Sequence, residues 1–295
     1  MKAIDFDYAR PSDVAEVCAL LDAAAGDGKI LAGGQTLVPL LAMRLARPAL
    51  IIDINRVAEL QGIECRPDEI VVRACTRQAT ALADEAIRRR LPLLAKALRF
   101  VGHAQTRNRG TVGGSLANAD PAAEIGLAAI TLGGAIMARS STGERRLPVA
   151  QFFRGAMETA LTAGECLTEV HFPVWPNGEG HVGTGFQEVS PRHSDFALAA
   201  AAAQLLLDEA GVCRRAAIGL GGIGTMPAHI DAAAERLLGT RLADRNIAAC
   251  AELAEQAIVT TADLHASATY RRRIAGELVR RAVAEARSDA LRGSV

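Results

Sequence analysis

The chain has 295 residues, of which 50% are hydrophobic and 22% charged, and its 33 Lys and Arg residues balance 33 Asp and Glu residues. This length can bury a full core, and a usual domain size of about 150 residues predicts two domains. A neutral balance lacks the cationic excess of nucleic-acid-binding proteins, and no apolar run reaches the roughly 18 residues of a membrane span. We therefore expect a soluble, cytoplasmic protein with no nucleic-acid partner and no direct membrane insertion.

The six cysteines are scattered and form no Cys-x-x-Cys pair. Iron–sulfur clusters of the ferredoxin type draw several thiolates from one tight loop, so this spacing argues against a cluster on this chain. The six histidines also lack the short spacings of metal ligands. We expect reduced thiols in the core and no metal site.

In the first half of the chain, helices and short strands alternate. Ser12 is expected to cap a helix that stops at Gly26. Two helices are expected between residues 80 and 99, and Asp120-Pro121 is typical of the start of a helix that runs to Leu132. Short apolar runs predict strands at 29–32, 50–54, 63–65, 70–74, 135–139, 145–149 and 165–172.

A turn-rich stretch around Trp175 to Gly180 suits a domain boundary, which we place near residue 178. Beyond it, the alanine-rich run 197–207 would be a helix by propensity alone. However, the polar loop 208–211 leads into another apolar run, so we predict a β-hairpin instead. Helical periodicity then predicts helices at 228–238, 245–258 and 267–287.

The motif Ala32-Gly33-Gly34-Gln35-Thr36 directly follows a predicted strand. Adjacent glycines permit positive φ and leave no Cβ, so successive backbone N–H groups can converge on a phosphate oxygen. Thr36 can add a hydroxyl, and each hydrogen bond to a charged phosphate contributes roughly 1.5 to 3 kcal/mol. Because Gly-Gly after a strand is more often a plain turn, this motif alone is a weak signal.

A second glycine turn, Gly110-Thr111-Val112-Gly113-Gly114-Ser115, repeats these residue types and is followed by Asn118 and Glu124. Two such turns in one domain suit a pyrophosphate, because its two phosphates can bind two separate cradles. A dinucleotide also has flat ends that pack against apolar side chains. The candidates for this packing, whose alternative is ordinary core, are Leu31, Val101 and Leu167.

Three segments together resemble the FAD-binding medium subunits of molybdenum hydroxylases, typified by aerobic carbon monoxide dehydrogenase and the flavin domain of xanthine dehydrogenase. They run from Ala32 to Leu41, from Arg107 to Glu124 and from Asp263 to Arg272, and the resemblance covers nearly the whole chain. With the residues above, it implies FAD binding by Leu31, Ala32, Gly33, Gly34, Gln35, Thr36, Val101, Gly110, Thr111, Gly113, Gly114, Ser115, Asn118, Glu124, Leu167 and Gln187.

The resemblance implies an α+β fold. A vanillyl-alcohol-oxidase-like FAD-binding domain would span 1–177, with subdomains at about 1–56 and 57–177, and a small antiparallel sheet with helices would span 178–295. Molybdopterin would lie on a large partner subunit that hydroxylates the substrate, and two [2Fe-2S] clusters on a small one that passes electrons to the flavin. The expected assembly is a dimer of heterotrimers. The substrate and the external electron acceptor stay open.

Three positions depart from the family pattern, and one of them is Thr106, which replaces the usual apolar residue before Arg107-Asn108. Relatives often carry a tyrosine near the flavin in a Gly-Asp-Tyr-Ala pattern, whereas this chain has Ser194-Asp195-Phe196-Ala197. The phenylalanine removes a phenolic hydrogen bond but retains a ring that can stack. Gln187 stands where relatives often carry a charge, so the resemblance does not imply electrostatic tuning of the flavin by this residue.

Other functions have less support. Gly219 to Gly224 matches Gly-x-Gly-x-x-Gly, but a Rossmann site needs a second parallel strand with an acidic residue after its helix. Here the predicted helix 228–238 is followed by further helix, so we predict close strand packing at these glycines. A free-standing FAD-dependent oxidoreductase acting on a small molecule is the main alternative, although no acid or base stands out. An adaptor that has lost its flavin is a weaker third reading, because both glycine motifs are intact.

Overall fold

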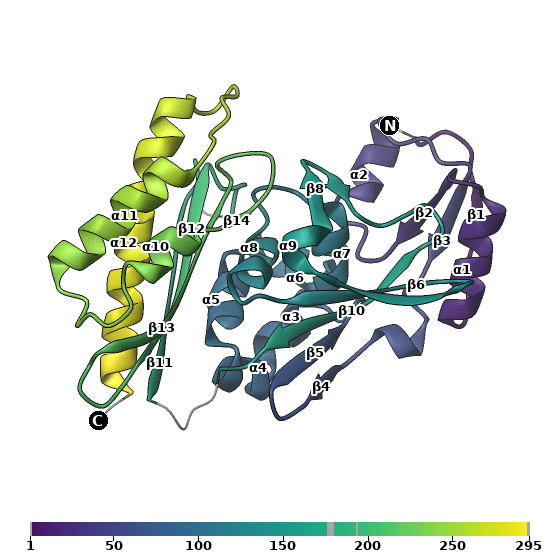
Figure 1. Ribbon diagram of the computed structural model, residues 1–295. Coiled ribbons are helices and arrows are strands. Elements are labelled where there is room, and N and C mark those ends of the chain that lie inside the picture. Colours follow the sequence, from purple (N-terminus) through teal and green to yellow (C-terminus); the bar gives the residue numbers. More distant parts are fainter. Residues whose placement is uncertain (1, 176–179, 193, 294–295) are drawn as a thin grey trace.

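The computed structural model describes residues 2–175, 180–192 and 194–293. Three larger sheets with their helices follow one another along the chain, and a two-stranded sheet, β8-β9, accompanies the second (Figure 1). The predicted α+β class is confirmed. The boundary predicted near residue 178 lies outside the described residues.

The first sheet is parallel and has three strands in the order β1-β3-β2. Asp13, not the predicted Ser12, caps its first helix, because the Asp13 carboxylate accepts the Glu16 N–H at 2.8 Å. Ser12 lies one residue earlier, and its own N–H donates to the Glu16 carboxylate at 2.8 Å. The elements are β1 (Asp7–Ala9), α1 (Val14–Ala23), β2 (Gly28–Leu31), α2 (Leu37–Ala42) and β3 (Leu50–Asp53).

The second sheet is antiparallel, in the order β4-β5-β10-β6-β7. Its strands are β4 (Ile63–Cys65), β5 (Glu69–Arg73), β6 (Ala135–Ser140), β7 (Gly143–Pro148) and β10 (Cys166–Pro173), which confirms the predicted runs. The shorter elements of this region are a 3₁₀ helix (Ala58–Leu60), α9 (Val149–Phe152), β8 (Phe153–Gly155) and β9 (Glu158–Thr159).

Six helices lie between β5 and β6, and two predictions here were wrong. Residues 80–99 hold parts of three helices instead of two, because Asp84 caps one helix and Pro92 opens the next. The last helix begins at Glu124, since Asp120 forms a turn by accepting the Ala122 N–H at 2.9 Å. The helices are α3 (Gln78–Ala83), α4 (Glu85–Arg90), α5 (Pro92–Phe100), α6 (Ala104–Arg109), α7 (Val112–Asn118) and α8 (Glu124–Thr131).

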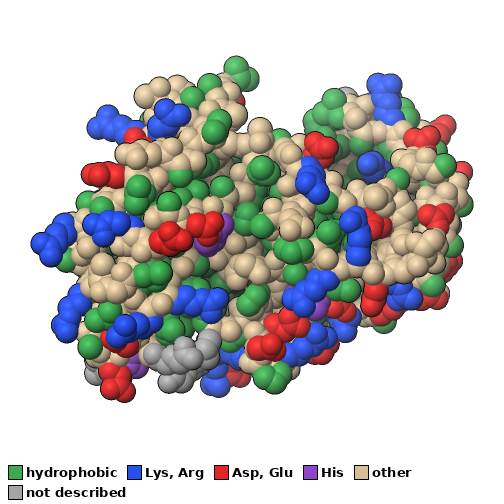
Figure 2. Space-filling view, in the orientation of Figure 1, with side chains coloured by type: hydrophobic (Ala, Val, Ile, Leu, Met, Phe, Trp, Pro, Cys, Tyr) green, Lys and Arg blue, Asp and Glu red, His purple; other side chains and the backbone are tan. Residues whose placement is uncertain are grey.

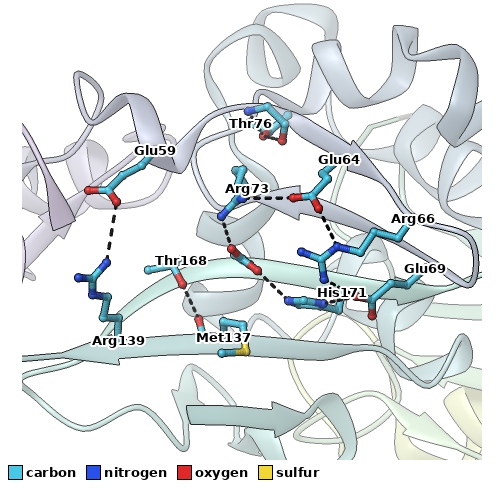
Figure 3. A network of polar contacts seen from close by, with 12 residues as sticks. Glu59, Glu64, Arg66, Glu69, Arg73, Thr76, Met137, Arg139, Thr168 and His171 are labelled. Atoms are coloured by element: carbon cyan, nitrogen blue, oxygen red, sulfur yellow. Dashed lines mark hydrogen bonds and ion pairs between the residues drawn. The ribbon is translucent and has the colours of Figure 1, made fainter. Parts of the chain in front are cut away.

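One face of the second sheet carries a network of ion pairs (Figure 3). Glu169 pairs with Arg73 across the strands and accepts from His171 at 2.8 Å. Glu69 contacts the other ring nitrogen of His171 at 3.1 Å and Arg66 at 2.7 Å. The alternate residues belong to the hydrophobic core and are Ile70, Val72, Val170 and Phe172. The network therefore satisfies the polar face of the sheet.

The third sheet is antiparallel, in the order β11-β12-β13-β14. The predicted hairpin is confirmed, but most of the helix predicted at 228–238 is not, because a short strand and a five-residue helix take its place. Helices α11 and α12 match the other two predictions. The elements are β11 (His181–Val189), β12 (Ala199–Leu207), β13 (Cys213–Gly221), β14 (Ala228–His229), α10 (Asp231–Glu235), α11 (Asp244–Ala257) and α12 (Ala268–Arg292).

The burial of strand β12 explains why its sequence favours a helix by propensity and shows no strand pattern. All nine of its residues are buried, because both faces of this sheet are covered. Ala200 and Ala202 belong to the core shared with the first domain, whereas Ala199, Ala201 and Ala203 belong to the core under α11 and α12. A strand buried on both faces has no alternation of polar and apolar residues, so the periodicity of its sequence does not identify it as a strand.

The third sheet packs directly against α5 of the first domain (Figure 1). The Phe100 and Phe186 rings lie 5.1 Å apart. Next to them the Lys96 ammonium donates to Glu285 at 2.8 Å and to Asp289 at 3.2 Å, both on α12. Apolar contact and a charge cluster thus join the two halves of the chain.

Five of the six cysteines are buried, as predicted, but Cys65 is exposed on the short strand β4. Burial raises the pKa of the Cys75 and Cys250 thiols to about 12, which makes both unreactive at neutral pH. Figure 2 shows Lys and Arg interleaved with Asp and Glu over the visible face. In the described part of the chain, no helix is long and apolar enough to cross a membrane.

Candidate functional site

The two glycine motifs, 77 residues apart in sequence, meet in space. Gly33 is buried, and a Cβ added to it would lie 2.5 Å from the Arg109 carbonyl oxygen and 2.8 Å from the Gly110 Cα. Neither backbone atom can move away without displacing its segment. Gly34 has a φ of +72°, in the left-handed region that favours glycine. Both glycines are therefore required by the local geometry.

The first motif leaves its backbone donors free. Throughout the described residues, no acceptor receives a hydrogen bond from the N–H groups of Gly33, Gly34, Gln35 or Thr36. The Thr36 side chain makes no cap hydrogen bond to α2 either. Adjacent N–H groups without protein partners form a concave donor site that suits an anion.

The second motif is not the open turn that we predicted. Thr111 caps α7 by accepting the Gly114 N–H at 3.1 Å, and the Gly113 N–H donates to the Ala74 carbonyl at 2.9 Å. A Cβ on Gly113 would lie 2.6 Å from the Ala74 Cβ, so this glycine allows close packing against the end of β5. What α7 offers a ligand is the half-buried Ser115 hydroxyl and the Asn118 amide.

A polar network that we did not predict from the sequence joins the two motifs. The Asn55 amide donates to the Ala32 carbonyl at 2.8 Å and to the Asp53 carboxylate at 2.6 Å. Arg77 donates to Asn55 at 2.6 Å and to the Arg109 carbonyl. The sequence feature that could have indicated this network is the pair Asp53 and Asn55 at the end of a buried strand, where polar side chains need partners.

This network also concentrates positive charge. Burial and the nearby Arg109 guanidinium lower the pKa of Arg77. Burial opposes ionisation of Asp53, but hydrogen bonds from Tyr8 and Asn55 outweigh it and hold its pKa below the ordinary value. The Arg77 guanidinium thus lies beside the first motif, because it donates to the Arg109 carbonyl that faces Gly33, and it favours an anionic ligand.

Glu124, the first residue of α8, carries a carboxyl group six residues after Asn118, the last residue of α7. Burial, with a smaller contribution from the Asp120 carboxylate, raises its pKa to about 7. At neutral pH the group is partly protonated and can donate as well as accept a hydrogen bond.

Gln187 and Glu188 point to opposite faces of β11. Gln187 donates to Glu285 on α12 at 2.8 Å, so this predicted flavin residue is turned away from the first domain. Glu188 lies on the same face as Phe186, which packs in the core of the first domain. Burial and the Glu124 carboxylate raise the pKa of Glu188 to about 8. Within the described structure, Glu188 Oε2 is buried without a hydrogen-bond partner.

The apolar residues considered for packing against a flat ring of the cofactor differ in how much of their surface is exposed. Val101 and Leu167 are 8% and 5% exposed and belong to the core, which leaves little surface for a flat ring. Leu31 is half-buried beside Gly34. Phe196 is 75% exposed and therefore presents a free ring face.

The structure bears out the rejection of a Rossmann site at Gly219. This residue lies in antiparallel β13, and β14 follows instead of a long helix. A Cβ on Gly219 would overlap the Thr131 hydroxyl, so the glycine serves close packing against α8. No group of three side chains able to hold a metal ion occurs among the described residues.

Comparisons with known proteins match both halves of the chain. A model described as "FAD binding domain in molybdopterin dehydrogenase" matches residues 4–175, and one described as "CO dehydrogenase flavoprotein C-terminal domain" matches residues 184–286.

Known relatives match along nearly the full length. The 6-hydroxypseudooxynicotine dehydrogenase complex subunit alpha of Paenarthrobacter nicotinovorans is 38% identical, over 97% of this chain and 96% of its own. The carbon monoxide dehydrogenase medium chain of Afipia carboxidovorans is 32% identical, over 97% and 98%. A chain of quinoline 2-oxidoreductase from Pseudomonas putida 86 superposes with a TM-score of 0.92 at 35% identity, covering 99% of this chain and all of that one. The chain therefore belongs to the family of FAD-binding flavoprotein subunits of molybdopterin dehydrogenases.

Proposed function

We propose that this chain holds FAD between its two glycine motifs and serves as the electron-transfer subunit of a molybdenum hydroxylase complex. It accepts electrons from a [2Fe-2S] partner subunit and passes them to an external acceptor. The observation that carries the proposal is the run of unpartnered N–H groups at Gly33 to Thr36, with the Arg77 guanidinium beside it on the Arg109 carbonyl.

The residues present fit the cofactor. The free N–H groups of Gly33 to Thr36 would bind the pyrophosphate, with the Ser115 hydroxyl on its other side. Asn118 and Glu124 would contact polar groups further along the nucleotide. Phe196 offers a ring for stacking, whereas Leu31, Val101 and Leu167 would line the site from the core. The isoalloxazine supplies the redox chemistry when FAD is bound.

Glu188 takes the place of Gln187 in this proposal. Its carboxyl faces the first domain, lacks a protein partner and has a raised pKa, so its neutral form can donate a hydrogen bond to the flavin. Gln187 contributes indirectly, because its bond to Glu285 holds β11 against α12.

The substrate is handled elsewhere in this proposal. Relatives that share this fold are named for 6-hydroxypseudooxynicotine, caffeine and carbon monoxide, which are chemically unlike one another. A subunit common to such different reactions suits a role in electron transfer, with hydroxylation on a large molybdopterin subunit.

The proposed assembly is a dimer of heterotrimers in the cytoplasm. Relatives are named as subunits or medium chains of larger complexes, which supports partner chains. The free thiols suit a reducing compartment.

A free-standing oxidoreductase is the second candidate, and one observation favours it. Glu124 and Glu188 have pKa values near neutrality, which suits general acid or base catalysis. In that case a small molecule would reduce the flavin without partner chains.

Flavin bleaching separates these two candidates. The tagged chain should co-purify with a large molybdenum chain and a small iron–sulfur chain, with a mass near that of two heterotrimers. Under anaerobic conditions, one member of a panel of aldehydes, purines, N-heteroaromatics and carbon monoxide should bleach the flavin of the complex and leave the isolated chain unchanged. Bleaching of the isolated chain by the same compound would refute the electron-transfer role.

A further inference from the structure

The third family-like segment, Asp263 to Arg272, surrounds a buried arginine. Arg271 lies in the first turn of α12 and is only 6% exposed. One of its terminal nitrogens donates to the Leu198 carbonyl at 2.6 Å and to the Gly222 carbonyl, and the other donates to the Asp263 carboxylate. A single guanidinium thus joins three loops of the second domain.

Asp263 is the anionic partner that holds this arginine in place. Asp263 accepts the His265 and Ala266 N–H groups at 2.9 Å each, and these bonds, together with Arg271, lower its pKa to about 2. It is therefore a fixed anion at any physiological pH. Ser267 caps α12 by accepting the Tyr270 N–H at 3.1 Å. Asp263 and Ser267 therefore have different partners, since Asp263 binds the guanidinium and Ser267 caps only the helix.

Hydrogen bonds lead from Arg271 to the candidate site through Gly222. While the Gly222 carbonyl accepts from Arg271, its N–H donates to the Pro121 carbonyl at 2.8 Å. Pro121 lies between Asn118 and Glu124, the two polar groups assigned to the nucleotide.

A second route passes through Leu198. Its carbonyl accepts from Arg271, and its N–H donates to the Val189 carbonyl at 2.8 Å. These two bonds tie Leu198 and Arg271 to the end of β11, directly after Glu188. One route therefore reaches the Asn118–Glu124 segment of the first domain, and the other reaches the end of β11.

We propose that Arg271 is a positioning residue for the flavin, holding the Asn118–Glu124 segment and the end of β11 at Glu188 and Val189 at the spacing that the bound cofactor requires. The inference rests on the proposed FAD binding. The planar guanidinium of Arg271 donates to several acceptors in fixed directions, which the point charge of a lysine cannot reproduce. The second domain would in this way help to hold a cofactor whose phosphates bind to the first.

The test compares three full-length variants for FAD affinity, for the visible circular dichroism of bound flavin and for the melting temperature of the flavin-free chain. Arg271→Gln should weaken FAD binding roughly tenfold, within the usual range of coupling between sites, and should change the flavin dichroism. Ser267→Ala removes the cap of the same helix, so it should lower the melting temperature and leave both flavin readouts unchanged. Arg280→Gln removes an exposed arginine of α12 that pairs with Glu277. This variant should change neither the two flavin readouts nor the melting temperature.

If Arg271→Gln does not fold, Arg271→Lys tests the positioning role in its place. It retains the charge, and we expect FAD binding severalfold weaker than in the wild type. A folded Arg271 variant with wild-type affinity and dichroism would overturn the positioning role, as would an equal loss of affinity in Ser267→Ala. A wild-type chain that binds no FAD would instead refute the proposed function.

Discussion

Gly33→Val should abolish FAD binding. The new side chain would overlap the Arg109 carbonyl and the Gly110 Cα, so it would separate the two glycine motifs. Losing two hydrogen bonds to a charged phosphate, at roughly 1.5 to 3 kcal/mol each, corresponds to at least about a 100-fold loss of affinity. Fluorescence titration of the flavin-free variant with FAD measures this loss.

Gly155→Ala is the matched control in the same domain, because a Cβ there meets only the flexible Glu158 side chain. It should bind FAD as the wild type does. Circular dichroism separates lost binding from lost folding, and Gly34→Ala, which strains a positive φ without touching the second motif, should weaken binding to a lesser degree. Unchanged affinity in Gly33→Val would contradict the placement of the phosphates.

Glu124→Gln should stabilise the flavin-free chain at pH 8 but not at pH 5. The carboxyl ionises near 4.5 in the unfolded chain and near 7 in the folded protein, so unfolding releases a proton between these values. The free energy of unfolding of the wild type therefore falls as the pH rises from 4.5 to 7. With allowance for solvent, the neutral glutamine should add about 2 kcal/mol at pH 8.

Urea unfolding at both pH values measures this difference. Glu188→Gln should act in the same direction, because burial and Glu124 raise the pKa of Glu188 as well. Glu252→Gln, on an exposed position of α11, should leave the pH profile unchanged. A profile that is equally steep in the wild type and in Glu124→Gln would show that this carboxyl ionises normally.

Local signals predicted most of the strands and the long helices. The hairpin at Pro67-Asp68 and the hairpin 199–221 could be predicted because turn residues separate apolar runs. The helix starts were harder to predict, because Ser12, Asp13 and Asp120 all have side chains that can cap a helix. Contacts beyond the local sequence decide which of them does so: Asp13 caps α1, whereas Asp120 forms a turn before α8.

The candidate site was predictable only in part. Gly33 and Gly34 could be proposed only because a second motif repeats the same residue types and the family resemblance covers both, since adjacent glycines after a strand more often form a plain turn. Arg77 and Asn55 could not, because their role depends on the meeting of two segments that are distant in sequence. Gln187 and Glu188 show a further limit, since a shift of one residue along a strand exchanges its faces.

Titration of the flavin-free chain with FAD and, separately, with riboflavin 5′-phosphate tests the central claim most directly. If the joined glycine motifs bind a pyrophosphate, one FAD should bind per chain, and riboflavin 5′-phosphate at least about 100-fold more weakly because it lacks the second phosphate and the adenosine. Equal affinity for the two ligands, or no FAD binding by a folded chain, would contradict the claim.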